Sequence, residues 1–512
     1  MSTSEVMLPI LLGLPLVGCL ALLLLPPGGA GDRLARPFAV AVSGATLVVA
    51  LVLTIGVARA EPGDRMSYEI DRPWVPALDL RLHLGVDGIS APLVLLTAAL
   101  VFLCLVYSLR IMPAAGRPRA FVALVLLLEV GMLGTFVALD LLLFFVLFEV
   151  VLVPMWFLVA GWGSEEPGVR RTAADKFILY TVLGSALMLV GFLVVYAQTG
   201  TFDMVRLAAE QGAGMSRGVQ LAAALLIVAG LAVKAPMWPL HTWLPDAHTA
   251  APTVGSVLLA GVLLKMGTYG LVRIAVPVVP EGFEQLAPYL AALGVVGIIY
   301  GSLACLAQRE IKRLIAYSSV GHMGFVLLGI ASLTQVGING ALFANVAHGL
   351  ITGLLFFLAG AIKDRHHTGD FEALGGGLYE RTPRLGGLLA FGAVASLGLP
   401  GLAGFWGELL AMLGAFRPAE SLDRSLFLVL MALAGLGTVL TAAYLLMLVR
   451  RVAQGASLER WRSPSALLGD AGTLELAVWT PVAGAVLVLG LWPSALLSMT
   501  DPAVRALLGG LP

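Results

Sequence analysis

Long, unbroken runs of apolar residues dominate the chain, and short polar stretches separate them. A helix that crosses a bilayer needs about 20 mainly apolar residues, whereas a membrane-spanning barrel shows short segments of alternating hydrophobicity. The runs have the helical length, so they predict an all-α polytopic membrane protein with about fourteen transmembrane helices. The predicted spans are residues 6–26, 37–59, 89–110, 118–139, 141–162, 177–198, 218–240, 252–273, 287–307, 314–333, 336–362, 385–413, 425–449 and 474–496.

The segments between the spans are too short to form a soluble domain with a core of its own. We therefore expect a single membrane domain over residues 1–512. The first span precedes thirteen others, which argues against a cleaved signal peptide. The expected parts are three N-terminal helices (1–117), a first half (118–273), a second half (287–449), and a C-terminal loop with the last helix (450–512).

Composition supports this class. Of the 512 residues, 59% are hydrophobic and only 12% are charged, and 31 Lys and Arg balance 31 Asp and Glu. Soluble domains contain about 25% charged residues. The balanced charge argues against nucleic-acid binding, which needs a basic surface, and the apolar content argues against disorder. Lipid is the expected surrounding.

Orientation follows from the basic residues. Lys and Arg are nearly twice as frequent in the loops after odd-numbered spans as in the other loops and tails. Positive residues favour the cytoplasmic side of a membrane. We therefore expect a multi-pass protein of the bacterial plasma membrane with both termini on the non-cytoplasmic side. An even number of spans also requires the termini to share a side.

The chain lacks the usual signals of a bound cofactor. Cys19, Cys104 and Cys305 lie in separate apolar runs, so one chain cannot form a four-cysteine iron–sulfur or zinc site. Neither a dinucleotide-binding nor a phosphate-binding glycine motif occurs. We expect no metal, nucleotide, flavin or cluster in this chain.

Seven titratable residues lie inside the predicted spans. A charged side chain at the bilayer centre costs about 2.5–3.5 kcal/mol on insertion scales and marks an ion pathway by default. Because burial favours the neutral form of Lys and Glu, such groups suit proton transfer. A purely structural Glu149–Lys234 ion pair is the alternative, but desolvation can exceed the Coulombic gain of a buried pair. The seven are Glu129, Glu149, Lys234, Lys265, His322, His348 and Glu408.

Helix-breaking residues accompany two of these groups. Pro236 follows Lys234, and Pro400 precedes Glu408 in a Gly-rich stretch. Broken helices at membrane depth line cavities and are typical of transporter sites. We therefore predict that the seventh and twelfth spans are discontinuous.

The spacing of these groups indicates an internal repeat. Glu149 and Lys234 are 85 residues apart, and His322 and Glu408 are 86 residues apart. Each distance joins a mid-span titratable residue to another at a broken helix two spans later. Spans 4–8 and 9–13 would then form two five-helix halves. An odd number of spans per half places the halves in opposite orientation, as an inverted repeat.

Several stretches resemble one known family. The chain is similar to the antiporter-like membrane subunits of the proton-pumping NADH:quinone oxidoreductase (respiratory complex I), which are related to Mrp-type cation/proton antiporters. The matching stretches are LGVDGISAPLVLLT (85–98), FEVVLVPMWFLVAGWG (148–163), VKAPMWPLHTWLPDAHTAAPT (233–253), LLKMGTYGLVR (263–273), KRLIAYSSVGHMGF (312–325), NVAHGLITGLLFFLAGAIKDRHHT (345–368) and LGLPGLAGFWGE (397–408).

The resemblance implies roles for the matched positions. Glu149 and Lys234 match the ion pair of the family, and Lys265 matches its central lysine. His322 and His348 match connecting groups of the hydrated axis. Glu408 matches the terminal group of the second half. Glu129 and His241 are secondary candidates for the same pathway.

The resemblance also indicates a class within the family. The L- and N-type subunits usually carry Lys at the position of Glu408, whereas the M-type carries Glu, and the chain has no room for the long lateral helix of the L-type. The implied partners of an M-type subunit are other membrane subunits of the complex, above all the L- and N-type. FMN, iron–sulfur clusters and quinone would be bound by other subunits.

Three alternatives remain at this stage. The chain could be a subunit of an Mrp-type cation/proton antiporter, although Glu408 and the absence of an extra carboxylate cluster count against it. It could also be a non-transporting assembly scaffold. Finally, His241, Asp246 and His248 could bind a metal, but Pro239 and Pro245 favour a structured turn beside the broken helix.

Overall fold

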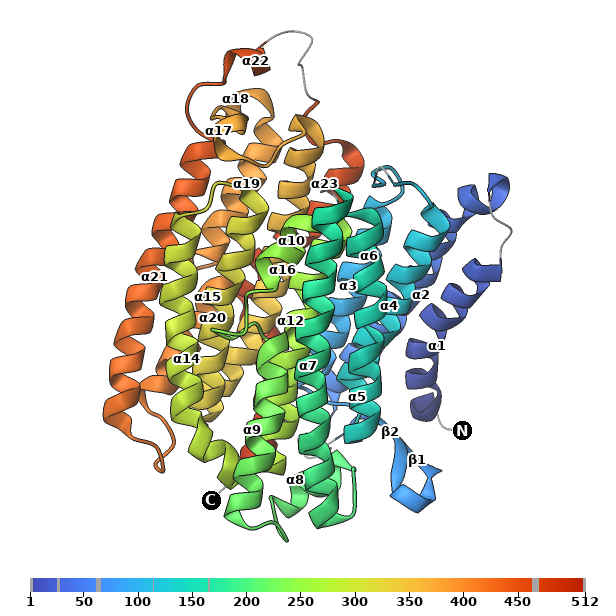
Figure 1. Cartoon of the computed structure of the whole chain (residues 1–512), viewed down its shortest axis with the longest axis vertical. Helices are drawn as coiled ribbons and strands as arrows, with labels where there is room; N and C mark the ends of the chain where they lie inside the picture. Colours follow the sequence, from blue (N-terminus) through green and yellow to red (C-terminus); the bar gives the residue numbers. More distant parts are fainter. Residues whose placement is uncertain are drawn as a thin grey trace.

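The computed structural model describes residues 3–24, 28–60, 66–113, 115–163, 166–462 and 469–509 (Figure 1). Its α-helices are α1 (Thr3–Leu24), α2 (Gly29–Arg59), α3 (Ala91–Tyr107), α4 (Pro118–Val137), α5 (Leu141–Val150), α6 (Leu152–Trp162), α7 (Pro167–Thr199), α8 (Met204–Glu210), α9 (Arg217–Lys234), α10 (Leu244–Ala250), α11 (Thr253–Leu258), α12 (Leu264–Gly270), α13 (Val276–Val278), α14 (Pro280–Leu306), α15 (Ile311–Ala331), α16 (Gln335–His366), α17 (Phe371–Leu374), α18 (Leu378–Arg381), α19 (Pro383–Ser396), α20 (Ala403–Phe416), α21 (Arg424–Val452), α22 (Glu459–Arg462), α23 (Thr473–Leu491) and α24 (Ser494–Leu508).

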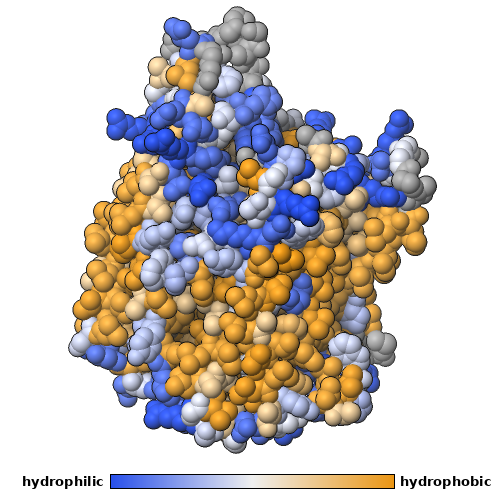
Figure 2. All heavy atoms as spheres, in the orientation of Figure 1, coloured by the Kyte–Doolittle hydropathy of each residue, from blue (hydrophilic) through white to orange (hydrophobic). Residues whose placement is uncertain are grey.

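Most of these helices form one bundle of apolar rods. Among the described residues, 12 helical segments are long and apolar enough to cross a membrane, and α3 and α20 are shorter apolar helices. Figure 2 shows a broad apolar band across the face in view, with hydrophilic residues concentrated toward its two ends. The prediction of an all-helical polytopic membrane protein is therefore confirmed, with about fourteen spans as an approximate count.

Two elements at one end of the bundle are absent from the sequence-based prediction. Strands β1 (Tyr68–Val75) and β2 (Leu80–Val86) form an antiparallel hairpin, and α24 follows the last span. A bridge joins Leu84 to Ala138, the backbone N–H of Arg81 donates to Asp140, and the ring of His83 contacts Asp203, so the hairpin is tied to the bases of α4, α5 and α8. We call this the hairpin end; both chain ends lie toward it in Figure 1, opposite α17, α18 and α22.

The two predicted breaks in transmembrane helices are present. Helix α9 ends at Lys234, and α10 begins only at Leu244. Helix α19 ends at Ser396, and α20 begins at Ala403, which is the predicted break within the span 385–413. The turn between them contains Gly398 and Gly401 in the positive-φ region that favours glycine.

A third break was not predicted. The chain that was expected to form one span over 141–162 is divided into α5 and α6 at Val151. Pro154 explains the break, because a proline has no N–H and its ring clashes with the carbonyl four residues earlier, here that of Val150. Glu149 therefore lies at the interruption itself.

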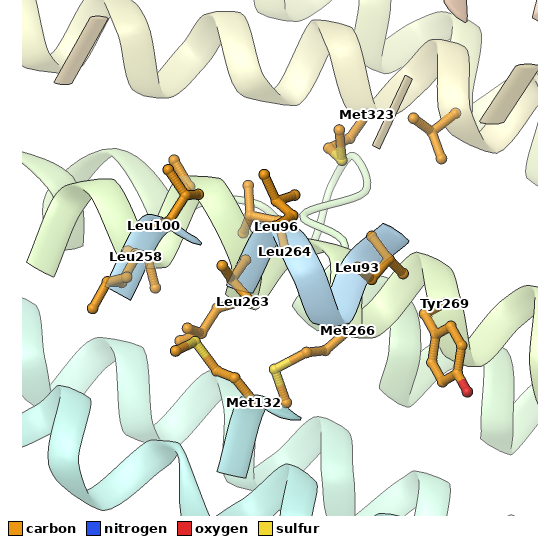
Figure 3. Close-up of a cluster of buried hydrophobic side chains, with 14 of the residues drawn as sticks. Leu93, Leu96, Leu100, Met132, Leu258, Leu263, Leu264, Met266, Tyr269 and Met323 are labelled. Atoms are coloured by element: carbon orange, nitrogen blue, oxygen red, sulfur yellow. The ribbon is translucent and has the colours of Figure 1, made fainter. Parts of the chain in front are cut away.

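The segment Thr253–Val278, which carries Lys265, lies at the centre of the bundle. The core of this span is fully buried inside the protein. Figure 3 shows its apolar surroundings, formed by Leu93, Leu96 and Leu100 of α3, Met132 of α4 and Met323 of α15. Because other helices enclose this span, the central lysine is held away from lipid and bulk solvent.

Candidate functional site: a buried axis of titratable side chains

The first pair of the axis is Glu149 and Lys234. Glu149 is half-buried at the end of α5, beside Ser185 of α7 and within electrostatic reach of Lys234. Lys234 is 1% exposed, and its ammonium lies 4.8 Å from the ring centroid of Phe148. No ion pair within 4.0 Å joins the two residues, and the Lys234 ammonium has no hydrogen-bond partner in the described part of the chain.

Local sequence explains where Lys234 lies. Pro236 has no N–H to continue α9, and the N–H of Met237 instead donates to the carbonyl of Ala232 at 2.9 Å. The ammonium therefore belongs to the last turn of a helix, where unpaired carbonyls favour a positive charge. Trp243 closes the turn, because its indole N–H donates to the carbonyl of Val233 at 3.0 Å.

Lys265 forms the next element of the axis. It follows a π-helical turn, Leu259–Leu263, a distortion that is frequent at functional sites. Its fully buried ammonium donates to the carbonyl of Ala260 and lies 2.6 Å from Nδ1 of His348 on α16. In its charged state Lys265 has only donors, so in that state Nδ1 of His348 accepts and the proton of the neutral ring is on Nε2.

His322 connects both parts of the broken twelfth span. Its Nε2 lies 2.9 Å from the hydroxyl of Ser396, the last residue of α19, and its Nδ1 lies 3.2 Å from Oε1 of Glu408 on α20. The ring centroids of His322 and His348 are 5.6 Å apart. The four side chains of Lys265, His348, His322 and Glu408 therefore form a continuous series across α12, α16, α15 and α20.

A small cavity of about 20 Å³ lies among His322, His348, Ser396 and Glu408. A water molecule needs about 10–15 Å³ of such volume and two to four polar partners. The Nε2 atom of His348 has no partner among the described residues, and His348 lines the cavity. One water in this position could join His348 to Glu408.

Not every predicted residue lies in this series. Glu129 is fully buried in α4, and neither of its carboxyl oxygens has a partner in the described segments. His241 is buried in the turn after Lys234, 5.1 Å from the ring centroid of Tyr300, and contacts no member of the series through a hydrogen bond within the described chain. No contact recorded among the described residues joins Lys234 to Lys265, so the two parts of the axis are separate here.

His248 was not predicted as a member of the axis. It is fully buried in α10, both ring nitrogens lack partners in the part of the chain described, and its ring stacks 4.4 Å from that of Phe356 on α16. The same helix carries His348. The sequence around His241 and His248 predicts only a turn. It does not predict the contact of His248 with α16, because that contact depends on how α10 folds back onto the bundle.

The prediction that the chain binds no metal concerns, in the structure, only the positions of possible ligands among the described residues. His241, Asp246 and His248 do not form a ligand cluster there, and Asp246 instead binds Lys176 at 2.7 Å. The described part has one cluster with ligand spacing, Asp71, His83 and Asp203, at the hairpin end. Both ring nitrogens of His83 already contact carboxylates there, at 2.7 Å from Asp203 and 2.8 Å from Glu69.

Known proteins with similar sequences identify the family of this chain. The family model described as NADH:quinone oxidoreductase/Mrp antiporter, TM, matches residues 138–448. The chain belongs to the NADH:quinone oxidoreductase/Mrp antiporter family of membrane subunits. It is 40% identical to NADH-quinone oxidoreductase subunit M of Rhodobacter capsulatus, over 98% of this chain and 96% of that protein. It is also 40% identical to NAD(P)H-quinone oxidoreductase chain 4 3 of Trichormus variabilis, over 84% and 78% of the two chains.

Solved structures agree with this family. A chain of respiratory complex I from Thermus thermophilus with bound NADH matches with a TM-score of 0.86 and 30% identity, over 99% of this chain and 100% of that chain. A chain of the Mrp complex from Dietzia sp. matches with a TM-score of 0.85 at 22% identity, which shows a shared fold. The expected place of this chain among the M-type family members is confirmed by the relatives named subunit M and chain 4.

Proposed function

We propose that this family member is a proton-translocating membrane subunit of an NADH:quinone oxidoreductase. Protons would move along the axis formed by Glu149, Lys234, Lys265, His348, His322 and Glu408. The contact series from Lys265 to Glu408 carries this proposal, because four titratable side chains from four helices meet inside an apolar bundle. Burying these groups is costly, and a proton pathway gives a reason for that cost.

The geometry suggests the direction of single transfers. The Lys265 ammonium donates to Nδ1 of His348, and the Nε2–H of that ring can pass a proton to a water in the neighbouring cavity. Glu408 can receive it, with His322 donating to its carboxylate. Because the Ser396 hydroxyl can donate or accept, it can contact Nε2 in either protonation state of His322.

The rest of the proposal follows the family. The chain would lie in a bacterial plasma membrane, with the hairpin end and both termini on the non-cytoplasmic side. Other membrane subunits of the complex, the L- and N-type in particular, would be its neighbours. The redox chemistry, with FMN, iron–sulfur clusters and quinone, would take place in other subunits, so this chain would be the non-redox part of a translocase.

The test is Glu149→Gln in membranes that contain the assembled complex. The change removes a charge with little change in shape. We expect NADH oxidation by an artificial acceptor, which bypasses the membrane arm, to stay normal while proton uptake and quinone-linked turnover collapse. Glu281→Gln is the matched control, because Glu281 is an exposed residue at the start of α14 whose carboxylate faces Arg217 and not a member of the axis.

The outcomes separate the alternatives. Intact pumping in Glu149→Gln would contradict the proposal and favour a structural role or an assembly scaffold. Proton transport driven by a cation gradient without NADH would favour the Mrp-type antiporter.

A further inference from the structure

A column of aromatic rings leads from Lys234 toward the hairpin end. The ring of Phe148, beneath the Lys234 ammonium, stacks on Phe144 with centroids 5.6 Å apart. Phe144 in turn lies nearly parallel to Tyr269, at 6.5 Å, and Phe136 meets Tyr269 edge-on at 5.3 Å. These rings come from α4, α5 and the central span, and each is 1% exposed or less.

The column ends at a large cavity. This cavity has a volume of about 710 Å³ and is lined by the base of the hairpin, α8 and α24, with Asp87 and Arg273 on its wall. Arg273 binds Asp87 at 2.5 Å and donates to the hydroxyl of Tyr269 at 3.2 Å. Water that enters the cavity can therefore reach Arg273, which contacts the first ring of the column.

Beyond Arg273 there is little for water to bind. The Tyr269 hydroxyl donates its one proton to the carbonyl of Phe136 at 2.9 Å and accepts from Arg273, so it has no donor left for water and only one acceptor position. Phe136 and Phe144 offer only apolar ring surface. Hydrophobic constrictions of this kind stop conduction by excluding water.

We propose that Phe136, Phe144 and Tyr269 form a water-excluding barrier that isolates Lys234 from the hairpin end, with the Arg273–Asp87 ion pair fixing Tyr269 in place. The inference rests on the proposed function, because isolation matters only if Lys234 carries protons. A pump in which the pair Glu149 and Lys234 was open to both sides would dissipate its own gradient. These three rings would prevent protons from flowing back from the hairpin end to Lys234.

The experiment measures passive proton entry without NADH. Complexes are reconstituted in vesicles with an internal pH indicator and a potassium clamp of the membrane potential, and the external solution is acidified. The variants are Phe144→Leu, Phe144→Val and Phe144→Ala, so that ring volume is removed in steps. We expect the leak to increase along this series and to reach at least about tenfold over the parent complex in Phe144→Ala, because water can then enter the constriction. The graded series also covers the case in which the alanine variant fails to assemble.

Phe283→Ala is the matched control, because Phe283 of α14 is equally buried but has no recorded ring contact with the column among the described residues. A second variant adds Lys234→Met to Phe144→Ala, and we expect the leak to fall back toward the parent level. A proton leak in the Phe144 variants no greater than that in Phe283→Ala would overturn the proposed barrier. A leak unchanged by Lys234→Met would overturn the claim that the barrier protects Lys234.

These results are independent of the test of the proposed function. The leak is measured at rest, whereas Glu149→Gln is measured during turnover. Intact pumping in Glu149→Gln would contradict the proposed function, but the leak of the Phe144 variants could still be measured and interpreted. Phe144 variants without an increased proton leak would contradict only the proposed barrier.

Discussion

Replacing His83 should loosen the hairpin in a pH-dependent way. His83 of β2 is almost fully buried and joins two carboxylates, Asp203 before α8 and Glu69 of β1. Burial opposes a positive charge on the ring, but the hydrogen bonds with Asp203 and Glu69 outweigh it and raise the pKa of His83. Burial likewise opposes the Asp203 charge, yet bonds from His83 and from backbone N–H groups lower the pKa of Asp203.

The size of the effect follows from these two contacts. A hydrogen bond to a charged group contributes about 1.5–3 kcal/mol when buried, which applies to Asp203. Glu69 is 44% exposed, so its contact is screened and adds about 0–1 kcal/mol. His83→Gln should therefore lower the local opening free energy of the hairpin by about 1.5–4 kcal/mol, or roughly ten- to several-hundred-fold in protection.

The sign of the pH dependence is fixed by the two shifts. Because the pKa of His83 is raised, its contribution is complete below about pH 6.5 and is lost as pH rises through the raised value. Because the pKa of Asp203 is lowered, its contribution is present above about pH 4 and is lost as pH falls through the lowered value. The difference between the parent and His83→Gln should be largest between these limits.

The assay is amide hydrogen exchange of residues 80–86 in lipid nanodiscs, corrected for the intrinsic pH dependence of exchange. Asp140 titrates nearby, since burial raises its pKa to about 6, but comparing parent and variant at each pH removes its contribution. Equal protection in the two proteins at pH 5.5, or a difference that grows above pH 8, would refute the reasoning.

Two further predictions concern packing and positioning along the axis. Gly267→Ala should destabilise the complex by about 1–3 kcal/mol, because the added Cβ would lie 2.7 Å from the carbonyl of Leu231 and the N–H of Ala235. Thermal unfolding should show a lower Tm than for Gly435→Ala, where nothing lies within 4 Å, and an equal Tm would contradict the close approach of α12 and α9. Ser396→Ala should lower the pumping rate and shift its pH profile while the complex stays assembled, because His322 loses one hydrogen-bond partner; an unchanged profile would show that the hydroxyl does not position the ring.

The sequence predicts the helical spans well because hydropathy over about 20 residues is a strong signal. It predicts the breaks after Lys234 and before Glu408 because proline and glycine leave a local signature. Pro154 carries the same signature for the break after Glu149. The run around it is so uniformly apolar that hydropathy alone indicates one continuous span.

The hairpin and the contacts of the axis are harder to predict. In strand β2, Leu80, Leu82 and Leu84 alternate with other residues, which is a strand pattern. The strand is so short that hydropathy averaged over about 20 residues does not show it. Nothing in the sequence shows that His348 rather than His248 contacts Lys265, since both lie on other helices. The gap between Lys234 and Lys265 is likewise a property of packing alone.

The most direct test of the central claim is the proton yield per NADH of Lys265→Met in the assembled complex. The substitution keeps the length of the side chain and removes the donor to His348. If Lys265 links the two parts of the axis, the number of protons taken up per NADH should fall while oxidation of NADH by an artificial acceptor stays normal. An unchanged number of protons per NADH would contradict a pathway through Lys265 and His348.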